Sequence, residues 1–346
     1  MARCKSCGVE LRTGARFCDM CGAKVEKICP NCGEVLRAQA KFCDLCGEKL
    51  PLAQLISRPK VHGDICAGRL HTVALKEDGT LLATGDNQFG QCDVADWTDV
   101  VAVAAGKYHT VAVRSDGTAL ATGDRTYGQC DIGDWTDIVA VAAGDSHTVG
   151  LRTDGTVIAA GRDSSGKCAL GNWKNIIAVA AGMDHTLGLC QDGTVLAAGE
   201  GLFGSCAVSK WNHITFIAAG HIHTIGINQM GRIQEADGFA APGVMDWSDI
   251  SRVAVSPFHT VGLKKDGTVL ASGDIQYGQC QVETWSHITN VAAGERHTVG
   301  LKEDGTVIAT GDNEANQCAV DGWRLCFLLL LHPLRDFSLA IAYSIF

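Results

Sequence analysis

The stretch AVAAGKYHTVAVRSDGTALATGDRTYGQCDIGDW, residues 102–135, holds one full unit of a pattern that repeats along most of the chain. Its His-Thr pair recurs at intervals of 38, 38, 38, 38, 36 and 38 residues, and a series of tryptophans follows with the same intervals. A fixed period of this length indicates a solenoid or a propeller. The histidines are His71, His109, His147, His185, His223, His259 and His297, and the tryptophans are Trp97, Trp135, Trp173, Trp211, Trp247, Trp285 and Trp323.

Each period contains four apolar runs of strand length, separated by turns that contain glycine. Three of them are typified by IVAVAAG, HTVGLR and TVIAAG, and the fourth surrounds GQC. Asp-Gly pairs such as Asp116-Gly117 favour tight hairpins, because glycine accepts a positive φ. Since no stretch favours a helix, the period predicts an all-β fold, a seven-bladed β-propeller of four-stranded antiparallel blades over residues 61–323.

The two ends of the repeat region complement each other. No tryptophan stands twelve residues before His71, but Trp323 follows the seventh repeat without an inner strand after it. The segment GDICAG, residues 63–68, can supply that strand. We therefore expect the ends to complete one blade together and to close the ring.

Eight cysteines near the start of the chain form two sets with one spacing, C-x2-C-x10-C-x2-C. Two C-x2-C turns brought together offer four soft ligands to a tetrahedral ion such as zinc. So short a unit buries too little apolar surface to fold alone, and structural zinc contributes about 10–16 kcal/mol to such folds. A disulfide framework and a rubredoxin-type iron centre are the alternatives. The spacing predicts a double zinc ribbon over residues 1–49 with two structural zinc ions, bound by Cys4, Cys7, Cys18, Cys21, Cys29, Cys32, Cys43 and Cys46.

Both regions resemble known families. The segments CPNCG and FCDLCG are similar to the knuckles of double zinc ribbon domains, which serve as contact modules for proteins or nucleic acids. The repeats resemble regulator of chromosome condensation repeats in their bacterial form, whose unit reads A-G-x-x-H-T-V-x-L-x-x-D-G-T-V-x-A-x-G. This resemblance implies a seven-bladed propeller. It also implies two activities found among relatives: nucleotide exchange on small GTPases, and inhibition of β-lactamases by covering their active sites.

The distribution of charge limits which classes of partner the protein can bind. Residues 1–60 contain 11 basic and 6 acidic residues, whereas the remainder contains 18 and 32. Non-specific nucleic-acid binding requires a basic surface, so nucleic acid is an unfavourable partner for the acidic propeller. The chain opens without the apolar core of a secretory signal, and we expect a cytoplasmic protein with reduced cysteines.

The repeated residues favour scaffolding over catalysis. No single copy of the histidine has a nucleophile or carboxylate that the others lack, and copies on neighbouring blades lie too far apart to share a metal ion. We expect each imidazole to hydrogen-bond backbone at the junction between blades, and the tryptophans to pack there. The repeated cysteines are expected to be small buried residues. No phosphate loop or nucleophile elbow is present, so we expect no enzyme activity.

Functional positions are expected where the repeats differ. Successive turns of an antiparallel meander alternate between its ends, so the AAGxxHT and GDxxxGQC loops should share one variable face. Such a face suits a protein partner, although unselected variation of solvated loops is the alternative. Phe89, Tyr127, Phe203 and Tyr277 recur and are interpreted as partly structural. The candidate partner-binding residues are Arg69, Lys107, Tyr108, Asp145, Met183, Asp184, His221, Phe258, Glu295 and Arg296.

Three segments depart from the repeat. The fifth repeat, NQMGRIQEADGFAAPG, lacks the Asp-Gly-Thr turn and is two residues short, which indicates either a degenerate blade or a ligand site. Residues 50–60 are expected to be a linker. The hydrophobic segment 324–346 lies outside the repeat, and its apolar runs are too short to span a bilayer.

Together these observations predict a non-enzymatic, monomeric scaffold that binds a protein partner through the variable face of the propeller. Guanine-nucleotide exchange on a small GTPase and inhibition of an enzyme are the alternatives. Nucleic-acid contact by the zinc ribbons is a further alternative.

Overall fold

The structure is a computed structural model that describes residues 63–201, 204–236 and 242–325. The eight cysteines of the predicted zinc ribbons, the predicted linker and Phe203 lie outside the described residues. Within those residues the chain forms seven antiparallel sheets of three strands each, and one short 3-10 helix, η2 (Val244–Asp246). The predicted all-β fold with seven repeated sheets is therefore confirmed.

Each sheet consists of consecutive strands, and we number the blades from β1–β3 to β19–β21. The inner strands are β1 (Asp64–Ala67), β4 (Val100–Ala105), β7 (Ile138–Ala143), β10 (Ile176–Ala181), β13 (Ile214–Ala219), β16 (Ile250–Val255) and β19 (Ile288–Ala293). The middle strands are β2 (His71–Leu75), β5 (His109–Arg114), β8 (His147–Arg152), β11 (His185–Cys190), β14 (Thr224–Asn228), β17 (His259–Lys264) and β20 (His297–Lys302). The outer strands are β3 (Leu81–Gly85), β6 (Ala119–Gly123), β9 (Val157–Gly161), β12 (Val195–Gly199), β15 (Ile233–Glu235), β18 (Val269–Gly273) and β21 (Val307–Gly311).

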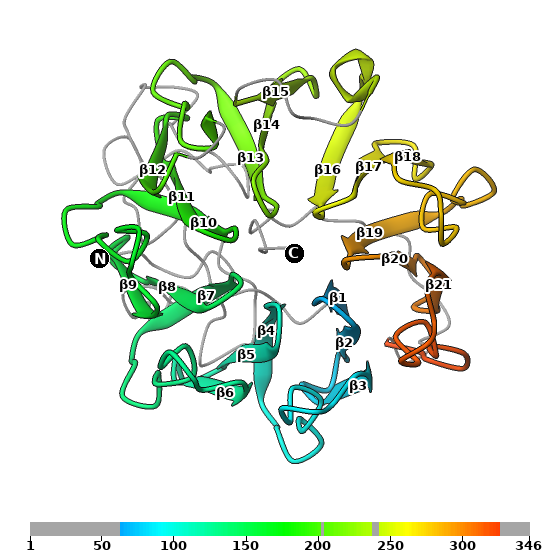
Figure 1. Cartoon of the computed structure of the whole chain (residues 1–346), viewed down its shortest axis with the longest axis horizontal. Helices are drawn as coiled ribbons and strands as arrows, with labels where there is room; N and C mark the ends of the chain where they lie inside the picture. The colour runs from blue at the N-terminus through cyan, green and yellow to red at the C-terminus, as the bar shows by residue number, and fades with distance from the viewer. Residues whose placement is uncertain (1–62, 202–203, 237–241, 326–346) are drawn as a thin grey trace, which may run out of the picture. The chain divides into compact units, whose positions relative to one another are not determined.

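The seven sheets form a closed ring with the inner strands around its axis (Figure 1). Each inner strand contacts the inner strand of the next blade, and β19 contacts β1. The ring is therefore closed as predicted, but the two ends do not complete one blade together, because each of the seven sheets consists of consecutive strands.

The ring closes through a few residues beyond Trp323. Leu325 is buried, its backbone N–H donates to Gly305 O at 2.9 Å, and its own carbonyl accepts from Glu77 N at 2.9 Å. A Cβ on Gly63 would lie 2.8 Å from Leu325 Cβ, so the two ends of the propeller are in direct contact. Residues 324 and 325 thus contact the propeller, although the predicted boundary is at residue 323.

The blades have three strands in the described residues, not the four predicted. The segment around Gly-Gln-Cys forms successive turns, in which Gly90 N donates to Asn87 O and Asp93 N donates to Gly90 O. The Gln91 carboxamide accepts from Phe89 N at 3.0 Å and donates to Asp86 at 2.9 Å. Because these polar groups bond within the segment, they do not form a fourth ladder.

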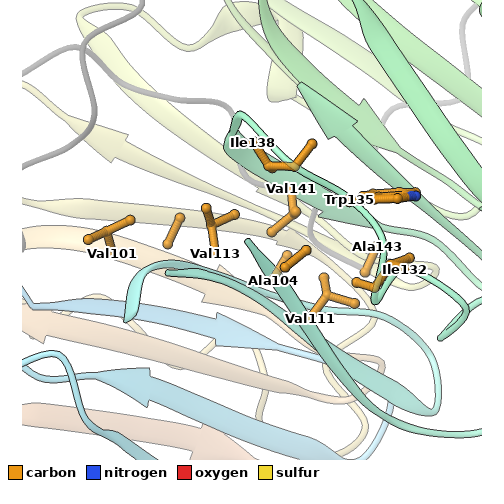
Figure 2. Packing of buried hydrophobic residues seen from close by; sticks show 11 residues of the cluster. Val101, Ala104, Val111, Val113, Ile132, Trp135, Ile138, Val141 and Ala143 are labelled. Atoms are coloured by element: carbon orange, nitrogen blue, oxygen red, sulfur yellow. The ribbon is translucent and has the colours of Figure 1, made fainter. Parts of the chain in front are cut away.

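The core lies between adjacent sheets. Figure 2 shows one such interface, where Val111 from β5, Val141 from β7 and Trp135 pack together with apolar neighbours from both blades. The position of Trp135 also explains why β8 has glycine at residue 150, because a Cβ there would lie only 2.6 Å from the indole Cζ3. The predicted packing of this tryptophan between blades is confirmed.

Candidate functional site

The histidines join each blade to the next. His109 Nε2 lies 2.9 Å from Thr148 Oγ1, and that hydroxyl donates to Gln129 O at 2.7 Å. Since the hydroxyl proton is committed to the carbonyl, the imidazole must donate from Nε2. The predicted backbone partner of the imidazole is therefore wrong: the partner is a threonine hydroxyl, because the carbonyl already accepts from that threonine. Equivalent contacts link His71 to Thr110, His147 to Thr186, His185 to Thr224, His259 to Thr298 and His297 to Thr72.

Burial keeps these imidazoles neutral. Desolvation lowers the pKa of His71 and His297 to about 3. The same cause lowers the pKa of His109, His185 and His259 to about 4. A general base works best when its pKa lies near the operating pH, so the histidine ring is suited to support and not to proton transfer.

The junction between the fifth and sixth blades differs from the others. His223 is only partly buried, and within the described residues it forms no hydrogen bond to Thr260. In the sixth blade Ser256 occupies the position where the other AAG loops have glycine, and its hydroxyl lies 2.8 Å from His259 Nδ1. The fifth and sixth repeats therefore differ from the others in structure as well as in sequence. A ligand site at this junction stays a prediction.

The AAGxxHT and GDxxxGQC loops lie at the same end of each blade, as predicted. The N–H of Asp86 donates to Leu70 O, and that of Asp124 donates to Tyr108 O, each at 2.8 Å. We call this end the loop face. The hairpins between middle and outer strands lie at the other end, where Ile138 N donates to Gly117 O, and we call that end the hairpin face.

Arginines and aromatic rings adjoin one another over four consecutive blades of the loop face. Arg69 of the first blade pairs with Glu295 of the seventh, and it donates to the Tyr108 hydroxyl of the second. The guanidinium also lies 5.5 Å from the centre of the Tyr108 ring. Phe89 packs against Tyr108 with ring centroids 5.1 Å apart, and its side chain is 48% exposed.

Arg296 continues this arrangement toward the sixth blade. Its guanidinium lies 4.6 Å from the centre of the Tyr277 ring and 5.9 Å from that of Phe258. It also donates to the Tyr277 hydroxyl at 3.0 Å. The side chain of Phe258 is 44% exposed. We call the connected set the arginine–aromatic band: Phe89, Tyr108, Arg69, Glu295, Arg296, Tyr277 and Phe258.

The remaining candidates form interactions of their own. Lys107 Nζ bonds Asp145 at 2.9 Å, and His221 Nδ1 lies 3.9 Å from the same carboxylate. Asp184 bonds Lys167, whose side chain is fully buried and also donates to the carbonyl of Met183 at 2.7 Å. Asp184 therefore pairs with the charge of the buried Lys167, and Met183 contributes a backbone carbonyl to the same ammonium group. Lys107 also lies beside the arginine–aromatic band, because its Nζ is 5.8 Å from the centre of the Tyr108 ring, whereas Asp145, His221, Asp184 and Met183 are not brought into it.

Sequence reasoning missed three kinds of residue. Phe89 and Tyr277 are members of the band, although their recurrence made them look structural. Lys167 is a buried charge, and its replacement of the glutamine in Gly-Gln-Cys was the available signal. Arg252 and Asn290 place polar groups on inner strands, where the second, third and fourth blades have alanine.

The repeated cysteines are protonated at neutral pH. Desolvation raises the pKa of Cys92 and Cys318 to about 12 and that of Cys130, Cys168 and Cys280 to about 11. Most of these thiols donate to a nearby carbonyl, as Cys130 does to Asp124 O at 3.2 Å. The eight cysteines of the described residues are free thiols.

The described residues contain no group of three or more His, Cys, Asp or Glu side chains arranged to hold a metal ion. Likewise, in residues 63–201, 204–236 and 242–325 no helix has the length and apolar character needed to cross a membrane.

The geometry so far defines a seven-bladed propeller of repeated three-stranded sheets, and sequence comparison identifies the repeat. The family model for the regulator of chromosome condensation (RCC1) repeat matches residues 64–91, 100–129, 138–167, 176–205 and 288–317. The double zinc ribbon model matches residues 4–47, which include all eight predicted zinc ligands. The chain therefore contains regulator of chromosome condensation repeats preceded by a double zinc ribbon. The fifth and sixth blades are the two without a match, and they flank the divergent junction.

Solved structures support the fold. The ectodomain of the receptor kinase CR4 from Physcomitrella patens aligns with a TM-score of 0.59 at 18% identity, covering 72% of each chain. The CRINKLY WD40 ectodomain of the receptor kinase ACR4 from Arabidopsis thaliana aligns with a TM-score of 0.56 at 18% identity, covering 72% of this chain and 96% of that one. At this identity the likeness shows the fold alone. A search of the curated proteins finds no match.

Proposed function

We propose that the protein is a non-enzymatic scaffold whose arginine–aromatic band binds a protein partner. The band is the observation that carries the proposal. Aromatic residues and arginine are the side chains that most often dominate binding free energy at protein interfaces. Here they adjoin one another over four consecutive blades, and both Phe89 and Phe258 leave about half of their side chains exposed.

Internal contacts hold the band in place before any partner arrives. Arg69 is fixed between Glu295 and Tyr108, and Arg296 is fixed against Tyr277. Side chains that are already ordered lose less conformational entropy on binding. Asp145 and Asp184 are held in place as well, but their carboxylates are occupied by lysines of the propeller.

The zinc ribbons and the compartment belong to the same proposal. The two identical sets of four cysteines support two structural zinc ions, with all eight thiolates committed as ligands and no open position for catalysis. The free thiols of the propeller support a reducing compartment such as the cytoplasm. Metal analysis of the purified protein should return two zinc ions per chain, and one or none would contradict the count.

The test is affinity capture from native cell extract with the full-length protein. A Tyr108→Ala, Phe258→Ala, Arg296→Ala variant should lose the partners of the wild type. A matched control on the hairpin face, Met230→Ala with Lys264→Ala, should retain these partners, because it leaves the loop face unchanged. Met230 is 75% exposed, so its replacement should not disturb the fold. Retention of the same partners by the triple variant would overturn the choice of surface. If the captured partner is a small GTPase, acceleration of GDP release would identify an exchange factor instead of a scaffold.

A further inference from the structure

Exposed apolar side chains gather on the loop face, in the blades that carry the arginine–aromatic band. Phe89 is 48% exposed, Phe258 is 44% exposed, and Ile275, two residues before Tyr277, is 74% exposed. All three belong to loops of the first and sixth blades, which are two of the four blades of the band. Because covering apolar surface is favourable, this part of the loop face is where a partner gains most by docking.

An aspartate adjoins the variable loop in each of the four blades of the band. In the sixth blade the Asp274 N–H donates to Phe258 O at 2.8 Å, and in the seventh the Asp312 N–H donates to Arg296 O at 2.9 Å. The first and second blades have the same backbone contact. The aspartates are therefore fixed beside the band, and they are Asp86, Asp124, Asp274 and Asp312.

The donors that hold these four carboxylates are neutral. The Asp274 carboxylate accepts from Gln276 N at 2.9 Å, and that of Asp312 accepts from Glu314 N at 3.0 Å. The other two carboxylates each accept from the glutamine carboxamide of their own loop. None of the four forms an ion pair with another of the described residues. Their negative charges therefore remain uncompensated within this part of the chain.

The band and the four aspartates together have an excess of negative charge. The acidic side chains are the four aspartates and Glu295, and the basic ones are Arg69 and Arg296, which leaves a formal charge of −3. Arg69 and Glu295 compensate each other as an ion pair. Lys107, beside the band, is likewise compensated by Asp145. The exposed aromatic and apolar side chains are thus surrounded by a surface that attracts cations.

We propose that the band binds a segment of the partner that presents lysine or arginine together with apolar side chains. This inference rests on the proposed function and names the chemistry of the partner at the same surface. The cationic groups pair with the four aspartates and stack on the exposed rings of Phe89 and Phe258, while the apolar groups cover Ile275. Residues 61–346 contain 32 acidic and 18 basic residues, so long-range attraction also accelerates the encounter.

Selection from a phage-displayed library of random short peptides tests this chemistry without a known partner. The full-length, zinc-loaded protein at low ionic strength should enrich peptides of net positive charge that combine lysine or arginine with leucine, phenylalanine or tryptophan. Enrichment of acidic peptides, which would use the donors of Arg296, would overturn the proposal. The absence of any enrichment would overturn it as well.

Two matched double variants locate the bound peptides. Asp274→Asn with Asp312→Asn removes two charges beside the band and keeps the oxygens that accept from backbone N–H, so binding of an enriched peptide should weaken about fivefold at low salt and less at high salt. Asp266→Asn with Asp304→Asn removes the same charge from two turns of the hairpin face and should change binding little. Equal weakening by both would show only a general attraction between opposite charges and would overturn the proposal.

The partner chemistry and the proposed function fail in different ways. If an enriched peptide binds the Tyr108→Ala, Phe258→Ala, Arg296→Ala variant as tightly as the wild type, the band is not the binding surface, and both are overturned. If the enriched peptides are acidic and lose binding in that variant, the band remains the binding surface and only the cationic partner is wrong. Cationic peptides that lose about tenfold or more in affinity for the variant would support both.

Discussion

His109 Nε2 lies 2.9 Å from Thr148 Oγ1, so the second and third blades are joined by a hydrogen bond between two buried side chains. The Thr148 hydroxyl donates a hydrogen bond to Gln129 O, which lies in the turn that follows the second blade. One histidine–threonine pair therefore ties together three segments of chain. Because the contact recurs at six of the seven junctions, the His-Thr repeat is the feature that couples neighbouring blades.

Removing the hydroxyl at one junction should destabilise the propeller. Thr148→Val keeps the shape of the side chain but leaves the imidazole N–H of His109 buried without an acceptor, at a cost of about 1–3 kcal/mol. The free energy of unfolding in urea measures this loss. Thr260→Val is the matched control, because His223 does not bond that threonine, and it should cost clearly less. Equal losses in both variants would contradict the assigned role of the contact.

Stability should decrease as the solution becomes acidic. The folded-state pKa of His71 is about 3 and that of His109 about 4, both below the 6.5 typical of an exposed imidazole. Between these values the unfolded chain binds more protons than the folded one. The stabilisation is complete above pH 6.5 and is lost as the pH falls toward the folded-state pKa, by up to about 1.4 kcal/mol per pH unit for each histidine.

Urea unfolding at several pH values above about 4.5, where carboxylates remain ionised, isolates this effect. His109→Gln removes one of the titrating groups and should reduce the slope of stability against pH by about one proton. A stability that does not change between about pH 7.5 and 5.5 would show that the imidazoles are not buried in neutral form.

A single added methyl group should disturb the interface between blades. Gly150→Ala places a Cβ 2.6 Å from Trp135 Cζ3, and overpacking of this kind costs about 1–3 kcal/mol. Gly133→Ala adds the same methyl where no atom lies within 4 Å and should be close to neutral. Thermal unfolding, followed by tryptophan fluorescence, compares the two. A neutral Gly150→Ala would mean that the indole can move aside.

The propeller cysteines should resist thiol reagents. Burial raises the pKa of Cys92, Cys130 and Cys318 to about 11 or 12, and the thiolate is the reactive form. With native protein near neutral pH, a chromogenic disulfide should therefore react slowly at these positions and rapidly after unfolding. Mass spectrometry of labelled peptides separates them from the ribbon cysteines. Fast labelling of Cys92 in the folded protein would contradict its protonated state.

Much of the fold could be predicted because its determinants repeat. The period of the His-Thr pair and the Asp-Gly turns specify the number and order of the sheets, and the position of Trp323 specifies the closure. The fourth strand could not be excluded from the pattern, because the segment around GQC has the length of a strand. The choice of turns depends on hydrogen bonds of the Gln91 carboxamide to Phe89 and Asp86. The Asp and Gln concerned recur in GDxxxGQC, but the repeat alone does not show that they bond to each other.

The site was harder to predict for two physical reasons. The AAGxxHT loops vary in sequence, but only their geometry shows that Arg69 and Arg296 contact aromatic rings while Asp145 and Asp184 are occupied by lysines. Arg252 and Asn290 align with Ala102 in the sequence, because each lies seven residues before its His-Thr pair. The repeat alone does not show which blade these side chains face.

The contact between Gly63 and Leu325 also bears on how the protein is made. The first inner strand leaves the ribosome early, but the blade next to it can be completed only after residue 325 has been synthesised. During most of translation β1 therefore has one open side, and closing a ring over so many residues is a slow, high-contact-order step. Refolding from urea should accordingly show a late phase that Leu325→Ala slows and that changes at interior blades affect less.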